Sequence, residues 1–402
     1  MRILWCHEVS YAEKPVYEYQ DFAERLAARG HDVEVIDFVE GAATTSGSAC
    51  ISRTGEAEVT LSSIPHSGLP LVKYVEARLR FRQMLEERIA TGALDAVFVY
   101  SVFINGTEAV TLCRKAGIPV VYRAIDAYHR LRPGKLAQAL LLSGERYIYR
   151  NANQVITTNE EMSAYVADVA GRDLIAPPVV LDHGVDENHF SPRSRDVELM
   201  TRYGITEADL VAVFLGTTYA FSGLVNLVRR MPDLLAAFPN LKLMIVGAGE
   251  QDEELAALVE SLGLTGRVIL TGMIDYLYVP RHLSLGAVAL NPFEINEITR
   301  DIVPIKILQY QAMGLPVVST PLPDLQRKHP PGVSGVVYSK DDGITSFIHR
   351  LGEVLKSGSL SETGTLGRHY METSFTVGAA IDKLERMLET MVKVPREARH
   401  DA

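Results

Sequence analysis

Residues 1–38, MRILWCHEVSYAEKPVYEYQDFAERLAARGHDVEVIDF, decide the fold class of the first half of the chain. MRILWCHEV is typical of a short buried strand, YEYQDFAERLAARG has the apolar spacing of a helix that ends at Gly30, and HDVEVIDF predicts a second strand. A helix between two strands indicates parallel pairing, because parallel strands need a crossover connection. We therefore expect an open, doubly wound α/β sheet.

The same alternation recurs along the chain in two series, separated by the polar stretch DENHFSPRSRD. The first series continues through LDAVFVYS, GTEAVTLCRKAG, IPVVYRA, a helix near 135–151 and QVITT, and the second begins at LVAVFLGTT. We predict two Rossmann-like domains facing each other across a cleft, residues 1–195 and 196–375. Residues 376–402 should form a helix that packs back on the first domain, followed by a tail.

Residues 41–90 interrupt the first series with a small, polar segment and then the basic amphipathic helix LPLVKYVEARLRFRQMLEERI. This helix is interpreted as a solvated flank of the first domain. An acceptor-facing or membrane-surface role stays open, because basic amphipathic helices also bind at lipid interfaces.

Composition excludes several classes of protein. The 402 residues carry a formal net charge of −10, which argues against general electrostatic binding of nucleic acid. Three scattered cysteines support neither a disulfide framework nor a zinc site, and we expect them reduced and mostly buried. No apolar run is long enough for a membrane span or a signal peptide, so the expected location is the cytoplasm.

The stretch DIVPIKILQYQAMGLPVVST, residues 301–320, predicts a helix whose N-terminus is an anion site. Pro304 suits the first helical turn, where a missing N–H costs nothing. The free N–H groups and the helix dipole attract phosphate, and Lys306 adds a positive charge within reach.

PIKILQYQAMGLPVVST resembles the donor-site helix of retaining GT-B glycosyltransferases of family 4. The stretches VVLDHGVDENHFSP, VAVFLGT, LMIVGAGE and VILTGMIDYLYVPRHLSLGAVALNPF are similar to other family segments in the same order. The resemblance covers about residues 145–325, and the first 140 residues match in architecture only. It implies transfer of a sugar from a nucleotide donor, such as a UDP-, GDP- or dTDP-sugar, to an acceptor hydroxyl without a metal or other required cofactor.

The resemblance also assigns donor residues. Asp301 and Gln309 take the places of two family glutamates that contact the donor sugar and the ribose, with the spacing kept. Many members hold the diphosphate with an arginine and a lysine after the first strand of this domain, where this chain has GTTYAFSGL. Lys306 would therefore carry more of the diphosphate. The remaining donor candidates are Gly216, Thr217, Thr218, Gly247, Gly249, Met273, Ile274, Arg300, Val303 and Pro304.

The acceptor side is expected in the first domain. VVYRAIDAYHRLRPGK follows a buried strand and brings Arg123, Asp126 and His129 to its carboxyl end. Asp126 and His129 are candidates for the family's catalytic histidine position, together with Lys306 and Asp301 on the donor side. Arg123, His7 and Glu8 are candidate acceptor-binding residues.

The predicted function is that of a retaining hexosyltransferase. Its acceptor is a small metabolite such as an antibiotic aglycone or aminocyclitol, or a glycan precursor that is lipid-linked. The acidic chain favours a soluble acceptor slightly, and the oligomeric state stays open. One alternative is a catalytically silent nucleotide-sugar-binding or scaffold protein, because the acidic pair and the diphosphate cations are changed. Another is a sugar-nucleotide epimerase, whereas a nicotinamide dehydrogenase is disfavoured because no GxGxxG opens a helix after a strand.

Overall fold

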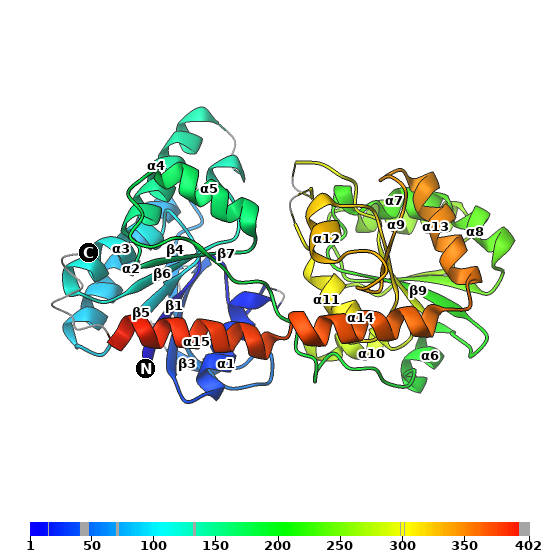
Figure 1. Cartoon of the computed structure of the whole chain (residues 1–402), viewed down its shortest axis with the longest axis horizontal. Coiled ribbons are helices and arrows are strands. Elements are labelled where there is room, and N and C mark those ends of the chain that lie inside the picture. The colour runs from blue at the N-terminus through cyan, green and yellow to red at the C-terminus, as the bar shows by residue number, and fades with distance from the viewer. Residues whose placement is uncertain are drawn as a thin grey trace. The chain divides into compact units, whose positions relative to one another are not determined.

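The computed structural model describes residues 1–14, 16–40, 48–69, 72–131, 134–297, 299–300 and 302–393. Its contacts divide the chain into two compact units, with residues 1–183 and 379–402 in unit 1 and residues 184–378 in unit 2. Each unit is a largely parallel sheet covered by helices (Figure 1), which confirms the expected α/β fold class with two Rossmann-like domains.

The division falls earlier in the chain than the sequence placed it, because residues 184–196 pack into unit 2. Val185 forms a bridge with Thr376, and Phe190 is fully buried in the core of unit 2. On the return crossing, the last helix begins in unit 2 and continues in unit 1. There Arg29 pairs with Asp382 and Glu385 of this helix, both at 2.6 Å.

The sheet of unit 1 has the strand order β3-β4-β2-β1-β5-β6-β7-β8. All its pairings are parallel except that of β3 with β4. The strands are β1 Arg2–Cys6, β2 Asp32–Glu40, β3 Ser48–Ile51, β4 Val59–His66, β5 Ala96–Val99, β6 Val120–Ala124, β7 Gln154–Thr157 and β8 Val179–Val180.

Strands β3 and β4 were not predicted, because their small and polar residues hid the strand pattern. β4 extends the sheet beside β2, and β3 folds back on β4. The loop between them is fixed by the fully buried Glu24, whose carboxylate accepts hydrogen bonds from the N–H groups of Arg53 and Thr54 and from the hydroxyl of Tyr11.

The helices of unit 1 include the predicted basic helix and the predicted helix near 135–151. They are α1 Glu18–Ala28, α2 Val72–Ala90, α3 Gly106–Ala116, the short 3-10 helix η1 Tyr128–Leu131, α4 Lys135–Asn151, α5 Glu160–Ala170 and, across the second crossing, α15 Val377–Lys393.

The sheet of unit 2 is parallel throughout, with the order β11-β10-β9-β12-β13-β14. Its strands are β9 Leu210–Leu215, β10 Leu241–Val246, β11 Val268–Leu270, β12 Val288–Asn291, β13 Val317–Ser319 and β14 Val336–Tyr338. They supply a core of fully buried aliphatic and aromatic side chains that includes Phe214, Leu243, Leu290 and Val318.

The helices of unit 2 cover this sheet, and one amphipathic stretch is divided between two of them. LVNLVRRMPDLLAAFP forms two short helices, because Pro232 cannot continue the ladder of the first and lies at the start of the second. The helices are α6 Val197–Tyr203, η2 Ala220–Ser222, α7 Leu224–Arg229, α8 Met231–Ala237, α9 Asp252–Ser261, η3 Tyr276–Tyr278, α10 Val279–Leu283, α11 Ile305–Ala312, α12 Pro323–Lys328, α13 Ile344–Lys356 and α14 Leu360–Ser374.

Each sheet has one point where the strand order reverses direction. In unit 1 it lies between β1 and β5, and in unit 2 between β9 and β12. Ligands of open α/β sheets bind outside the carboxyl ends of the strands at such points. The residues that follow these strand ends are His7 and Tyr100 in unit 1, and Gly216 and Pro292 in unit 2.

Gly223 tests the close packing at the reversal point of unit 2. Its φ is +71°, and a Cβ atom there would lie 2.0 Å from the carbonyl oxygen of Pro292. Gly263 has a similar φ of +65° with no atom within 4 Å, so it isolates the backbone cost of alanine. Gly263→Ala should cost about 1 kcal/mol, and Gly223→Ala roughly twice that or more. Calorimetric melting of both variants checks this, and equal shifts in melting temperature would contradict the steric role of Pro292.

Candidate active site

Helix α11 is held over the reversal point of unit 2 by Tyr310. The phenol oxygen accepts the N–H of Leu215 at 2.6 Å and donates to the carbonyl of Leu290 at 3.3 Å, so it connects α11 to β9 and β12. Pro304 precedes the helix as its N-cap, with ψ at 126°, rather than occupying the first turn as predicted. The helix consequently begins at Ile305, and Lys306 is its second residue.

Lys306 lies between two aromatic rings at the carboxyl ends of the strands. Its Nζ is 3.9 Å from the ring centroid of Phe214 and 3.8 Å from that of Phe293. A Cβ atom added to Gly216 would be 3.8 Å from the same Nζ, so the ammonium is next to the glycine turn after β9. Burial lowers the pKa of Lys306 well below its usual value. Among the described residues, no carboxylate pairs with it.

The turns after β9 and β10 pack backbone against backbone. Gly247 has φ +132°, and a Cβ there would lie 2.2 Å from the carbonyl oxygen of Gly216. Gly249 is equally constrained, because a Cβ would lie 2.8 Å from the N atom of Thr218. Only glycine fits at these positions, so the two turns approach each other closely.

These turns leave backbone donors available. Within the described ranges, the N–H groups of Thr217, Thr218 and Ala248 have no acceptor. The Thr218 hydroxyl already donates a hydrogen bond to Asp252, at 2.6 Å. Among the described residues, the groups on this edge that could attract an anion are thus one ammonium, the first turn of α11 and backbone N–H groups without an acceptor.

The other predicted donor residues of unit 2 differ in exposure. Gln309 is buried on α11, and the structure assigns its side chain no hydrogen bond within the described ranges. Met273 is 61% exposed, Ile274 is partly buried and packs on the core, and Val303 does the same. Arg300 is exposed. Asp301 lies outside the described residues.

Arg123 is a buried structural residue of unit 1, which corrects its assignment to acceptor binding. Its guanidinium donates to both carboxylate oxygens of Glu18, at 2.7 and 2.5 Å, and to the carbonyl of Thr157 at 2.7 Å. His183 Nδ1 lies 2.7 Å from Glu18, in a geometry that falls short of a hydrogen bond. With its donors used and its side chain fully buried, Arg123 has no surface to offer a ligand.

His7 lies at the reversal point of unit 1 and is neutral. Its Nδ1 accepts the backbone N–H of Glu8 at 2.8 Å, so Nε2 carries the proton and donates to the Tyr17 hydroxyl at 2.8 Å. Burial lowers the pKa of His7 to about 3, and the ring stacks on Tyr100 with centroids 5.1 Å apart. His7 is 5% exposed and Glu8 is half-buried, so Glu8 is the more accessible of the two.

Asp126 and His129 follow β6 on the same edge. The Asp126 side chain is exposed and has no hydrogen-bond partner in the described part of the chain. Surrounding protein raises its pKa and His183 opposes that rise, but exposure limits the effect. His129 Nδ1 lies 2.9 Å from the fully buried carboxylate of Glu145, which also accepts the Tyr165 hydroxyl at 2.5 Å. This arrangement leaves His129 Nε2 as the nitrogen that can contact a ligand.

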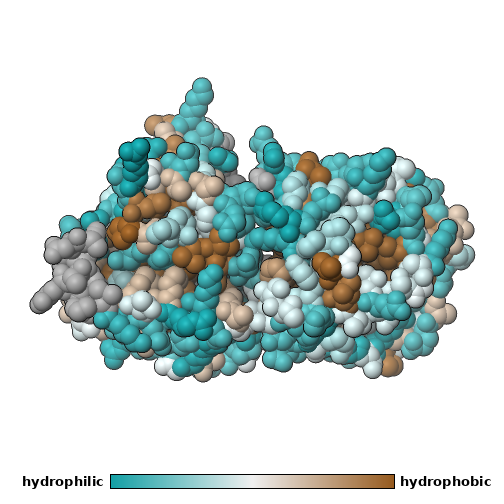
Figure 2. Space-filling view, in the orientation of Figure 1, coloured by the Kyte–Doolittle hydropathy of each residue, from teal (hydrophilic) through white to brown (hydrophobic). Residues whose placement is uncertain are grey.

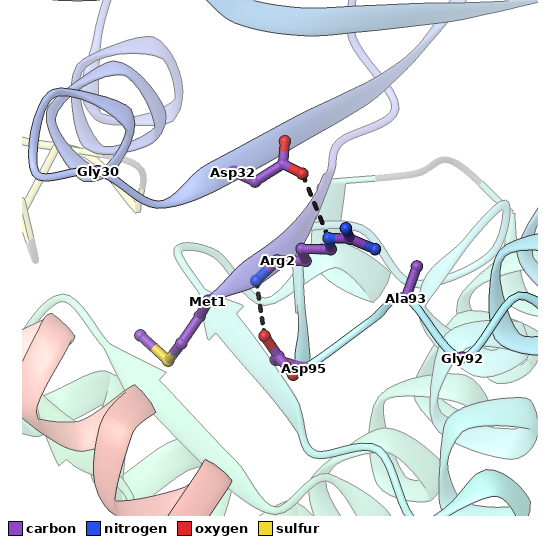
Figure 3. A pocket seen from close by; sticks show the side chains of 7 residues that line it. All are labelled: Met1, Arg2, Gly30, Asp32, Gly92, Ala93 and Asp95. Carbon is purple, nitrogen blue, oxygen red and sulfur yellow. Dashed lines mark hydrogen bonds and ion pairs between the residues drawn. The ribbon is translucent and has the colours of Figure 1, made fainter.

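A separate cavity of about 350 Å³ opens at the opposite, amino edge of the unit 1 sheet (Figure 3). In it Arg2 lies 3.6 Å from Asp32, and its backbone N–H donates to Asp95 at 2.8 Å. It is lined by Met1, Arg2, Gly30, Asp32, Gly92, Ala93 and Asp95. These polar groups satisfy one another, and the cavity lies away from the strand ends where ligands bind.

Two further findings concern metals and membranes. Within the described residues, no three or more His, Cys, Asp or Glu side chains come together as metal ligands. None of the described helices combines the length and apolar character that a membrane crossing requires.

Family models match both units. Residues 209–357 match a model described as glycosyl transferases group 1, and residues 18–178 match a glycosyl transferase 4-like domain. The chain belongs to the GT-B glycosyltransferases of the family 4 type. The resemblance first inferred from the helix of residues 301–320 is thereby confirmed, and this transferase carries Lys306 in the group 1 unit.

Curated relatives of the transferase match part of it. A GDP-mannose-dependent α-(1-6)-phosphatidylinositol monomannoside mannosyltransferase of Mycolicibacterium smegmatis is 27% identical over 201 residues, 48% of this chain and 52% of that protein. An α-D-kanosaminyltransferase of Streptomyces kanamyceticus is 26% identical over 144 residues, 36% of each chain. The chain therefore spans about half of these relatives or less.

Solved structures share the fold over the whole transferase. A sucrose-phosphate synthase from Thermosynechococcus elongatus superposes with a TM-score of 0.73 at 16% identity, covering 98% of this chain and 100% of that one. The Anabaena protein HepE, in complex with UDP and glucose, gives 0.70 at 16% identity over 97% and 99%. At such identities the likeness is one of fold.

Substitution of Glu18 tests the buried pair of unit 1. Burial raises the pKa of Glu18, but Arg123 and His183 lower it by more than burial raises it, so that the pKa is about 2. Because this value lies below that of an unfolded glutamate, Glu18 contributes stability above pH 4.5 that is lost as the pH falls from about 4.5 to 2. Glu18→Gln should be less stable than wild type at pH 7, with the difference shrinking in acid. Urea unfolding followed by fluorescence of the single tryptophan, Trp5 of unit 1, measures this. A difference that does not change with pH would contradict the ion pair.

Proposed function

We propose that the transferase moves a sugar from a nucleotide-sugar donor to an acceptor hydroxyl, with retention at the anomeric carbon and without a metal. The observation that carries this is the position of Lys306, an ammonium that has no carboxylate partner among the described residues. It lies at the reversal point of unit 2, beside backbone N–H groups that have no acceptor in the same part of the chain. That combination suits a diphosphate, which brings the negative charge that the site lacks.

The reaction needs little from a protein base. The bond between the anomeric carbon and the diphosphate oxygen breaks, a bond to the acceptor oxygen forms on the same face, and the acceptor proton passes to the departing phosphate. Lys306 and the N–H groups of Thr217 and Thr218 stabilise the charge that develops on the leaving group. The remaining task is positioning, which can supply a large share of the rate enhancement.

Donor recognition is proposed along the same edge of unit 2. Gly247 and Gly249 let the backbone approach the nucleotide, and the backbone at Met273 and Ile274 faces the base. Gln309 can bond ribose hydroxyls as both donor and acceptor. Asp301 contacts the sugar, and Arg300, Val303 and Pro304 border it. UDP-, GDP- and dTDP-sugars are the candidates, since one relative is named for GDP-mannose and the HepE structure contains UDP.

The acceptor is proposed to bind at the carboxyl edge of unit 1. Asp126 is exposed there, and His129 can direct Nε2 toward a hydroxyl because Glu145 occupies Nδ1. Glu8 is a further proposed contact, and His7 holds it in place by accepting its backbone N–H. The relatives' names cover both acceptor classes considered from sequence. One names a phosphatidylinositol monomannoside, and another, a glucosyltransferase of Streptomyces kanamyceticus, names 2-deoxystreptamine. We place the reaction in the cytoplasm.

An apolar band on unit 1 favours an acceptor presented at a membrane. Its side chains are all exposed and lie on or beside helices α2 and α4. Phe103 connects these two helices, because its ring contacts Arg78 and Tyr74 of α2 and the neighbouring Val102 packs against Gly144 of α4. Figure 2 shows hydrophobic surface on unit 1 near its top, where α4 lies. The band consists of Leu69, Val72, Val75, Leu79, Phe103, Leu136, Leu140 and Tyr147.

Charge points to an anionic lipid surface as the occupant. Helices α2 and α4 each carry a net charge of +2, whereas the whole chain carries −10. A two-fold contact between copies would set these basic helices against themselves, because such an interface is self-complementary. A lipid surface accepts both the apolar side chains and the basic ones.

Lys306→Ala tests the donor site. The variant should bind nucleotide-sugars at least about tenfold more weakly, because a charge-assisted contact contributes on the order of 1.5–3 kcal/mol. Thermal shift against UDP-, GDP- and dTDP-sugars measures this, since ligands that bind only the folded state raise the melting temperature. Lys356→Ala, an exposed lysine of the same unit, is the matched control. If no nucleotide-sugar stabilises wild type, the donor site is refuted, and if binding occurs without transfer or hydrolysis, the silent-binder alternative is supported.

Vesicle sedimentation tests the apolar band. Wild type should sediment with vesicles that contain phosphatidylglycerol more than with phosphatidylcholine alone. Leu79→Glu combined with Leu140→Glu should weaken this binding at least about tenfold, because each buried leucine contributes roughly 1.5–3 kcal/mol. Val197→Glu in unit 2, where Val197 is 73% exposed, is the control. Equal sedimentation of the band variant and the control would contradict the membrane proposal and leave a soluble acceptor.

A further inference from the structure

The ammonium of Lys306 is enclosed by the faces of two buried rings. Both centroids lie within 3.9 Å of Nζ, well inside the distance of about 6 Å at which a cation and a ring attract each other. Phe214 is the penultimate residue of β9 and is fully buried, Phe293 is 7% exposed, and the ring centroids are 6.5 Å apart. Lys306 itself is 6% exposed, so water solvates its charge poorly.

The charged groups that the structure describes on the neighbouring elements are either bonded to other partners or exposed. Helix α11 holds no other charged residue, and the turn from Gly216 to Gly223 holds none. After β10, the Glu250 carboxylate accepts a hydrogen bond from the backbone N–H of Ala220. The Asp252 carboxylate accepts hydrogen bonds from the Thr218 hydroxyl and from the backbone N–H of Gly249. After β12, the Glu294 carboxylate accepts a hydrogen bond from the side-chain amide of Asn226. Glu297 and Arg300, which follow in the chain, are exposed, and Asp301 lies outside the described residues.

Two physical effects therefore act on Lys306 in opposite directions. Burial disfavours the charged form and lowers its pKa. The negative faces of the two rings favour the charged form, and a desolvated cation gains about 2 kcal/mol or more from such a face. The rings are the groups in the described structure that can offset the cost of burial.

We propose that Phe214 and Phe293 are positioning residues, a two-ring clamp that keeps Lys306 charged and directed at the turn after β9 before the donor arrives. The ligand of this clamp is the donor diphosphate, so this part rests on the proposed function. Because the turn from Gly216 to Gly223 contains no cation, the clamp maintains the positive side chain that lies beside this turn.

The decisive variants are Phe293→Leu, which keeps an apolar side chain without a ring face, and Phe293→Tyr, which restores the ring. The first measurement is the titration of Lys306 itself, monitored by ¹³C NMR of protein labelled at lysine. The Lys306 signal is assigned by its absence from the spectrum of Lys306→Ala. The midpoint should fall in Phe293→Leu relative to wild type and recover in Phe293→Tyr. Equal midpoints in all three proteins would overturn the clamp, and this outcome does not depend on donor binding.

The second measurement is the affinity for UDP and GDP by calorimetry between pH 6.5 and 9. The affinity of Phe293→Leu should fall as the pH rises, because Lys306 loses its proton. This fall should be at least about tenfold larger than the fall in wild type over the same pH range. Adding Lys306→Arg should remove this extra pH dependence, since a guanidinium stays charged. Parallel profiles of wild type and Phe293→Leu would overturn the clamp.

Asp301→Asn separates the clamp from a carboxylate partner. If the rings keep Lys306 charged, this variant leaves the Lys306 midpoint near that of wild type. A fall as large as that of Phe293→Leu would show that Asp301 supplies the counter-charge, and it would overturn the proposal. Absence of UDP and GDP binding together with the expected midpoints would refute the donor site and leave the clamp standing.

Discussion

A buried ammonium that no carboxylate of the described residues neutralises is the constraint around which unit 2 is arranged. Lys306 can occupy this position because ring faces surround it and because Tyr310 holds α11 against β9 and β12. A buried carboxylate partner would satisfy the ammonium and reduce its attraction for an incoming anion. The unsatisfied charge thus lowers the stability of the unit, and such charges are expected where a bound ligand supplies the missing partner.

Unit 1 treats its buried charges in the opposite way. Arg123 and Glu18 satisfy each other completely, and the carboxylate of Glu145 is bonded to His129 and Tyr165. These pairs fix the loops that follow β1 and β6 while presenting little net charge. A weakly charged edge suits a neutral, hydroxyl-rich acceptor, whereas the edge of unit 2 suits a diphosphate.

The sequence predicted the features that depend on periodicity and on local chain direction. The parallel sheets and the helix Ile305–Ala312 followed from alternating apolar segments, whereas the role of Lys306 stays a prediction. The sequence could not reveal partners distant along the chain. Glu18 precedes Arg123 by more than a hundred residues, and the ion pair that removes Arg123 from the surface depends on that contact. Phe214 and Phe293 looked like ordinary core residues for the same reason, and β3 and β4 were missed because their serines and threonines weaken the strand pattern.

The two kinds of surface on this transferase lead to one view of its acceptor. The exposed apolar side chains of α2 and α4 are unfavourable in water, and the fold of a chain of net charge −10 does not require them. They lie on the unit whose carboxyl edge offers Asp126 and His129, and basic residues accompany them. An aminocyclitol would need only the polar edge. A lipid-linked glycan would use the polar edge for its hydroxyls and the apolar band for the surface that presents it, so the lipid-linked class accounts for both features.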